Sequence, residues 1–332
     1  MNIRAREEIH ETARQALNRA PHARQILMTY IGINLGLSLL LVGLSFYFSN
    51  QISGTGGLGN IGLRSVLSTG QSVLPLVQLL INACLNLGYH IAILCIIRNF
   101  EASTQTLFTG FRFFFPMLRL LLLQVFLYAG LMFLSVYISS FIFMATPFSR
   151  EFMAVITPVL ESVTVMDTTL VLDDATFLAA SQAVIPMFWI MIPVCALLAL
   201  PLFYRLRMAT FALADEPRRG ALAAFVKSRR LMRGNCTALF RLDLSMWWFY
   251  LGQIIISLVC YGDVLLPMLG ITLPFSETTG YFLFYGVYLV LQFAICWLFL
   301  NRVSVTYALA YQSILPEKPK DNGVVLGNIF QM

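Results

Sequence analysis

The sequence has few charged residues for its length. Only 11% of its 332 residues are Asp, Glu, Lys or Arg, whereas 58% are apolar; soluble domains carry roughly 25% charged residues. Such a chain cannot cover a soluble surface with polar side chains, and its apolar residues form runs long enough to cross a bilayer. The composition excludes a disordered chain, a collagen and a secreted disulfide scaffold. It predicts an all-α fold, a polytopic helical membrane bundle whose first partner is the lipid bilayer.

Residues and motifs typical of catalysis or metal binding are also scarce. The chain has three histidines, two of them in the first 25 residues, and it contains no P-loop, GxSxG or HExxH pattern. Asp173 and Asp174 stand alone rather than in an acid cluster of the kind that binds Mg²⁺. We therefore predict a protein that is not an enzyme and has no cofactor and no metal.

The six cysteines form no CxxC pair. They fall in the apolar runs, at their edges or in a basic loop, which favours reduced packing cysteines over a disulfide or metal framework. They are Cys84, Cys95, Cys195, Cys236, Cys260 and Cys296.

Six apolar runs have the length that a bilayer requires. A hydrocarbon core of about 30 Å needs ~20 helical residues. The first run is too long for the apolar part of a signal peptide, so we expect it to remain as a span. The predicted spans are 26–48, 74–97, 119–144, 183–204, 243–261 and 281–301.

The segments outside these spans have their own patterns. Residues 1–25 alternate charged and apolar residues at helical spacing, which predicts an amphipathic helix on the cytosolic surface of the membrane. Residues 205–241 form a basic cytosolic loop, and residues 302–332 form a cytosolic C-terminal tail. Two partly apolar stretches in the outer loops, 152–160 and 264–273, are candidates for re-entrant or interface-lying segments.

The basic residues test this layout, because cytoplasmic loops collect Lys and Arg. Of 22 Lys and Arg, 20 lie on the proposed inner side, and only Arg64 and Arg150 lie on the other. This distribution predicts six spans with both termini in the cytoplasm. It also explains the net charge of +6 without a nucleic-acid partner.

The predicted second span carries polar side chains at every fourth position. Such a stripe faces the bundle interior or a wet cavity rather than lipid. One interpretation is a polar cavity or headgroup site in which the histidine titrates near neutral pH. The other is hydrogen bonding between helices, to Asn34, Gln124, Gln253 or Gln292. The stripe consists of Gln78, Asn82, Asn86 and His90.

Two other spans contain residues that shape helices. Gly32 and Gly36 in the first span form a GxxxG pattern, which favours close packing inside the bundle or a seam with a second copy of the chain. The fourth span contains Pro186, Pro193 and Pro201, which predict a static kink or, as the alternative, a moving hinge.

The basic loop contains a helix pattern, between residues 221 and 234, in which apolar and basic residues alternate faces. This pattern predicts a helix at the inner leaflet that is attracted to anionic lipid. Membrane anchoring is one interpretation, and a site for a lipid phosphate or a partner protein is the other. The candidate contact residues are Arg205, Arg207, Lys227, Arg230, Arg233 and Asp243.

The same loop carries the most specific local motif, Ser-x-x-Leu-Met-x-Gly at 228–234 followed by Phe-x-Leu-x-Leu-Ser-x-x-Trp at 240–248. With Tyr204, Arg205 and Met208, it resembles an uncharacterised family of Gram-positive bacterial multi-pass proteins, an integral-membrane domain of unknown function. The resemblance is specific over residues 200–250. It implies a bacterial plasma-membrane protein with no known enzymatic role, although the long outer loop 146–181 departs from the family pattern.

Three functions fit these observations. The leading hypothesis is a non-enzymatic, transport-associated or partner-binding subunit that handles lipid or exported peptide. The second is an immunity-type or scaffold protein, since its outer loops carry seven carboxylates and two arginines and could attract a cationic peptide. The third is a lipid-modifying enzyme that uses His90 or Asp243, with Arg205 and Arg207 holding a phosphate.

Overall fold

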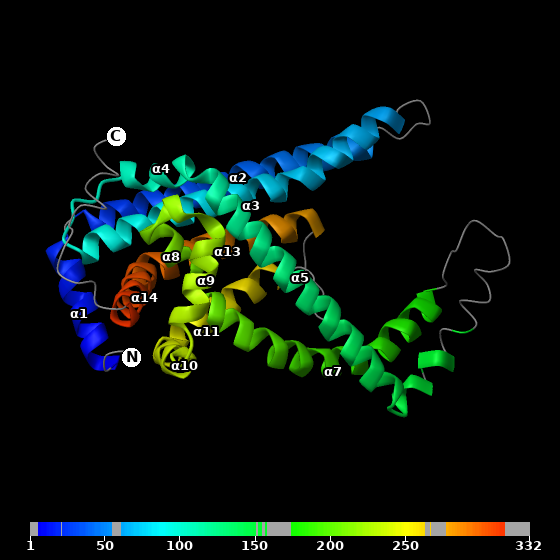
Figure 1. Ribbon diagram of the computed structural model, residues 1–332. Coiled ribbons are helices and arrows are strands. Elements are labelled where there is room, and N and C mark those ends of the chain that lie inside the picture. The colour runs from blue at the N-terminus through cyan, green and yellow to red at the C-terminus, as the bar shows by residue number, and fades with distance from the viewer. Residues whose placement is uncertain are drawn as a thin grey trace. The chain divides into compact units, whose positions relative to one another are not determined.

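The computed structural model describes residues 6–20, 22–54, 61–150, 152–154, 157, 174–262, 266 and 277–315. All regular elements among these residues are helices, which confirms the all-α prediction (Figure 1). Five helices are long and apolar enough to cross a membrane, and a bent pair gives a sixth, so the fold is polytopic. The five are Ala23–Ile52, Leu67–Ile97, Phe114–Met144, Ile185–Asp215 and Thr279–Ile314.

The chain divides into two compact units. The main unit comprises residues up to 118 and from 208 onward, and the hairpin unit comprises residues 119–207. In the hairpin unit, α5 (Phe114–Met144, from residue 119) and α7 (Asp174–Leu206) meet where Cys195 Sγ lies 3.4 Å from Met132 Sδ. Helix α7 stays continuous through its three prolines. The stretches 152–160 and 264–273 lie largely outside the described residues.

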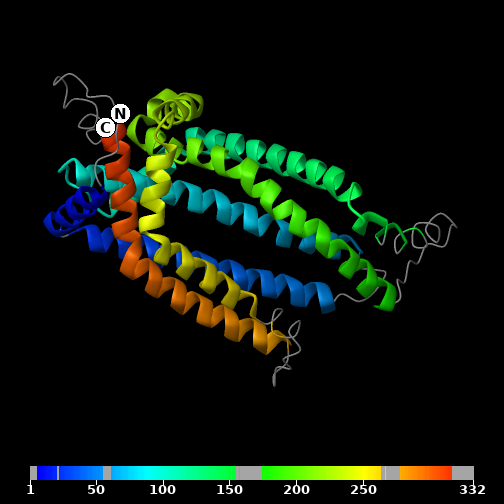
Figure 2. The same ribbon diagram turned by 90° about the horizontal axis from the view of Figure 1, so that it is seen from below.

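The apolar helices of the main unit pack in pairs, as Figure 2 also shows. Helix α2 (Ala23–Gly54) packs along α3 (Ile61–Ile97), and α11 (Trp247–Cys260) packs along α13 (Glu277–Ile295). With 32 residues, α2 is about 48 Å long, so its ends extend beyond a hydrocarbon core of about 30 Å. These helices contain the predicted spans 26–48 and 74–97 and most of 243–261 and 281–301.

The closest helix contact is made by glycines other than those expected. A Cβ atom at Gly88 of α3 would lie 1.9 Å from the Leu107 carbonyl oxygen, and one at Gly110 of α4 (Gln105–Arg112) would lie 2.0 Å from that of Cys84. The backbones of α3 and α4 therefore touch. Within the described residues, nothing lies within 4 Å of a Cβ at Gly32 or Gly36. This corrects the prediction that Gly32 and Gly36 pack inside the bundle, whereas a seam with a second copy stays a prediction.

The remaining described segments of the main unit fold into short helices, which we call the helical cap. The basic loop contributes most of them, and the predicted C-terminal tail contributes a helix that the sequence analysis did not anticipate. The cap consists of α1 (Arg6–Arg19), α4, α8 (Ala209–Asp215), η2 (Pro217–Arg219), α9 (Gly220–Leu231), α10 (Cys236–Ser245) and α14 (Asn301–Ile314).

Helix α14 is the core of the cap. Val305, Ala308, Ala310 and Tyr311 have no exposed surface, because α1 and α3 pack against α14. It continues α13 through a π-helical turn at Cys296–Leu300. Together they form one helix of 36 residues, about 54 Å, which is too long to lie wholly within a bilayer core.

Helices α10 and α11 form a bent pair. Their axes differ by 69° across a break at Met246, and Figure 1 accordingly shows α10 nearly end-on. The predicted span 243–261 begins inside α10. Helix α11 contains most of this predicted span, and α10 turns away from it into the cap.

Candidate functional site

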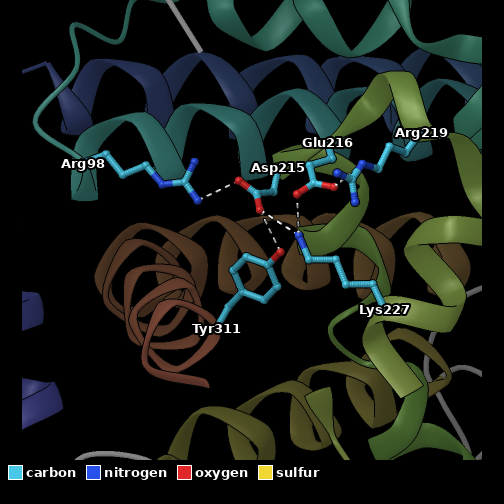
Figure 3. A network of polar contacts seen from close by, with 6 residues as sticks. All are labelled: Arg98, Asp215, Glu216, Arg219, Lys227 and Tyr311. Carbon is cyan, nitrogen blue, oxygen red and sulfur yellow. Dashed lines mark hydrogen bonds and ion pairs between the residues drawn. The ribbon is translucent and has the colours of Figure 1, made fainter. Parts of the chain in front are cut away.

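A buried carboxylate connects three helices of the cap, α8, α9 and α14, with the end of α3. Asp215 is the last residue of α8, and it is joined by side chains from the end of α3, from α9 and from α14 (Figure 3). We call this set of side chains the Asp215 hub. It consists of Arg98, Asp215, Glu216, Arg219, Lys227 and Tyr311.

Both oxygens of Asp215 have partners. An Arg98 guanidinium nitrogen lies 2.7 Å from Oδ1. On the other oxygen, Oδ2, the Lys227 ammonium lies at 3.0 Å and the Tyr311 hydroxyl donates at 3.1 Å. The Asp215 side chain is only 6% exposed, so all three donors act at low dielectric.

The neighbouring carboxylate shares one of these cations. Glu216 Oε1 accepts a hydrogen bond of 3.1 Å from Lys227, so the ammonium bridges both acids. Arg219 Nε lies 2.9 Å from Glu216 Oε2, outside hydrogen-bonding geometry, and the Arg219 side chain is 72% exposed. The pair that includes Arg219 therefore contributes little, because water screens exposed ion pairs.

Local backbone geometry positions the two outer donors. Helix α3 ends at Ile97, and Asn99 follows with φ 59°, the left-handed conformation that commonly ends a helix. This turn leaves Arg98 at the helix end, beside α8. Tyr311 projects from buried α14, and the ammonium of Lys227 lies 5.8 Å from the centre of its ring.

An aromatic contact extends from the hub to the polar stripe of α3. Phe211, one turn before Asp215 in α8, stacks on Tyr311 with ring centres 5.9 Å apart. The rings of His90 and Phe211 form a T-shaped pair, with centres 4.3 Å apart and planes at 90°. His90 Nδ1 donates to the Asn86 carbonyl oxygen at 2.7 Å. The last residue of the stripe is thus packed between its own helix and α8.

The rest of the stripe lies half-buried in the main unit. Gln78 donates to Ser38 of α2 at 3.1 Å, whereas Asn34 donates to the carbonyl oxygen of Tyr30 in its own helix. Asn82 Oδ1 is buried and has no hydrogen-bond partner among the described residues. The outer part of the stripe therefore faces α2, and a polar cavity along it stays a prediction.

The predicted inner-leaflet contacts differ in their surroundings. Arg205 and Arg207 belong to the hairpin unit, where Arg207 lies over the Phe203 ring at 5.1 Å. Arg230 and Arg233 are exposed on the cap, as expected of lipid contacts. Lys227 and Asp243 have other roles, and this corrects their assignment as lipid or partner contacts: Lys227 is paired inside the hub, and Asp243 is 8% exposed.

A second buried carboxylate holds the bend between α10 and α11. Asp243 of α10 accepts a hydrogen bond from Tyr307 of α14, and the Tyr307 hydroxyl also contacts that of Tyr250 in α11. At the end of α10, just before the bend, His10 of α1 lies 3.0 Å from the Ser245 hydroxyl. Side chains from both termini therefore fix the angle between α10 and α11.

Sequence reasoning missed the hub. Asp215 and Glu216 are the only adjacent acids in a loop with nine basic residues, and this was a usable signal for buried ion pairs. In the sequence, Arg98 is only one of the basic residues that indicate the orientation of the chain. No residue near Tyr311 marks it as a partner of Asp215. Chemically, the hub is a closed network in which each acid is neutralised by a cation. It holds α3, α8, α9 and α14 together.

The chain was also compared with known proteins. No curated protein and no solved structure matches it. The family model described as "Protein of unknown function (DUF975)" matches residues 1–317, nearly the whole chain. The motif-based resemblance to an uncharacterised membrane family agrees with this match. The chain therefore belongs to the DUF975 family, whose function is unknown.

Proposed function

We propose that this protein is a non-enzymatic subunit of a bacterial plasma membrane, with cytoplasmic termini, which binds a partner through the helical cap and serves in transport of lipid or exported peptide. The Asp215 hub is the observation that carries the proposal. It supports a cap with one fixed arrangement, and a pre-organised surface binds a partner without a large ordering cost.

The energy cost of burying the hub indicates that its role is to select one packing of the helices, beyond stabilising the fold. Burying Asp215 with two cations costs desolvation energy, which the ion pairs offset only with good geometry. Apolar residues of similar size often stabilise a protein equally well. We infer that the hub is retained because it selects one packing of α3, α8 and α9.

The link between the hub and the stripe supports an association with transport. Arg98 directly follows the helix that carries Gln78, Asn82, Asn86 and His90, and Phe211 joins His90 to the hub. A partner that shifts α8 would therefore also shift the inner end of the polar stripe. Polar groups within membrane spans commonly mark substrate pathways.

Photo-crosslinking in native membranes tests the proposal. A photoreactive residue replaces Arg14, Phe108 or Arg218, which are exposed in three different cap elements. We expect a discrete adduct with one partner from at least one position, and loss of this adduct in Asp215→Asn. Tyr311→Phe, which keeps both ion pairs, is the matched control and retains it. The proposal fails if no position gives an adduct, or if the adduct survives Asp215→Asn unchanged.

A further inference from the structure

Helix α10 has an exposed apolar face. Phe240, Leu244 and Trp248, spaced four residues apart across the end of the helix, are 52%, 60% and 65% exposed. The opposite face is buried, with Leu239 and Leu242 at 2% or less. Large apolar side chains at this exposure mark a surface that is covered in the functional state.

This face continues into the exposed face of α11. From Trp248 the stripe runs through Leu251, Ile255 and Leu258, which are 36%, 51% and 54% exposed. Helix α11 belongs to a candidate membrane span, so its exposed apolar face meets lipid. The axis of α10 departs from that of α11 by 69°, so α10 runs steeply across the direction of this candidate span.

Exposed cations lie near the residues of the apolar face in the sequence. Residues 220–245 contain five basic residues and one acid, Asp243, which is buried. One cation, Lys227, is held in the Asp215 hub. The four exposed cations are Arg229, Arg230, Arg233 and Arg241, at the end of α9, in the following turn and in α10.

We propose that α9 and α10 form a shelf that binds anionic phospholipid in the leaflet on the cap side of the membrane. Phe240, Leu244 and Trp248 enter the boundary between headgroups and acyl chains, and the four arginines contact lipid phosphates. The stacked rings of Trp247 and Trp248, 3.7 Å apart at the bend, suit the aromatic belt of that interface. This shelf is independent of the partner proposed for the cap.

Tryptophan quenching by brominated lipids tests the shelf. The full chain with Trp189→Phe and Trp297→Phe keeps only Trp247 and Trp248, which report on the shelf. It is reconstituted in phosphatidylcholine bilayers that contain brominated phosphatidylglycerol or brominated phosphatidylcholine. The variant replaces Arg229, Arg230, Arg233 and Arg241 with Gln. The matched control replaces four exposed arginines elsewhere, namely Arg14, Arg19, Arg112 and Arg218.

We expect brominated phosphatidylglycerol to quench more strongly than brominated phosphatidylcholine. A basic residue near an anionic surface favours binding by roughly five-fold, so the shelf variant loses at least about five-fold in preference, and the control keeps it. Continued quenching of the shelf variant by phosphatidylcholine shows that α10 still lies on the bilayer. Equal quenching by both lipids in the parent chain overturns the proposal. Quenching by neither brominated lipid also overturns the proposal, because protein or water would then cover the shelf.

Discussion

Tyr311 donates a hydrogen bond to the buried carboxylate of Asp215 across 96 residues of sequence. The contact joins helix α14 to α8. In the sequence, α8 belongs to a basic loop, and that loop by itself indicates only how the chain is oriented in the membrane. The same carboxylate oxygen receives Lys227, and the other receives Arg98. Asp215 is therefore the point at which segments from the middle and the end of the chain become one folded cap.

Loss of the Asp215 charge tests this role. Asp215→Asn leaves Arg98 and Lys227 mostly buried beside a neutral amide, although Glu216 still offsets Lys227. We expect the free energy of unfolding to fall by about 3 kcal/mol. Tyr311→Phe removes one neutral donor and costs about 1 kcal/mol. Unfolding by SDS in mixed micelles measures both, and equal losses for the two variants would show that the ion pairs do not hold the cap.

The close contact between α3 and α4 predicts different effects on stability for two glycine substitutions. Gly110→Ala places a methyl group against the backbone of Cys84 and Gly88, which cannot move aside as a side chain can. We expect a loss of about 3 kcal/mol as α4 is pushed away from α3. Gly36→Ala meets open space and leaves stability unchanged or raises it by up to about 1 kcal/mol. Thermal unfolding in detergent distinguishes these outcomes, and a comparable loss at Gly36 would contradict the described packing.

The fold class and the positions of the long apolar helices could be predicted because bilayer length and hydrophobicity constrain each helix separately. The GxxxG pattern at Gly32 was misleading because small residues permit a close contact without specifying its partner. Gly88 and Gly110, which do make the contact, lie on two helices and have no common motif. In the same way, the Asp215 hub depends on Arg98 and Tyr311, which are distant in sequence and approach Asp215 only after α3 and α14 pack.

The bend between α10 and α11 depends on Tyr307. Tyr307→Phe removes the hydroxyl that donates to Asp243 and contacts Tyr250, and it leaves a buried carboxylate without that donor. We expect a loss of about 2 kcal/mol and faster amide hydrogen exchange in residues 236–250. Tyr261→Phe, at an exposed tyrosine at the far end of α11, is the control. Unchanged exchange around the bend in Tyr307→Phe would show that this hydroxyl does not fix the angle.

Salt dependence separates the buried part of the hub from its surface. Arg98 is 21% exposed and Arg219 is 72% exposed, although each faces one acid of the same adjacent pair. At about 1 M salt the Debye length is about 3 Å, so exposed pairs are screened while buried pairs keep most of their energy. We expect Arg98→Gln to cost about 3 kcal/mol at both about 0.05 M and about 1 M NaCl. Arg219→Gln should cost at most about 0.5 kcal/mol at low salt and nothing measurable at high salt. If the loss of unfolding free energy from Arg98→Gln also disappeared at high salt, water would have access to the Asp215 carboxylate. The hub could then not hold α3 and α8 together as a buried ion pair.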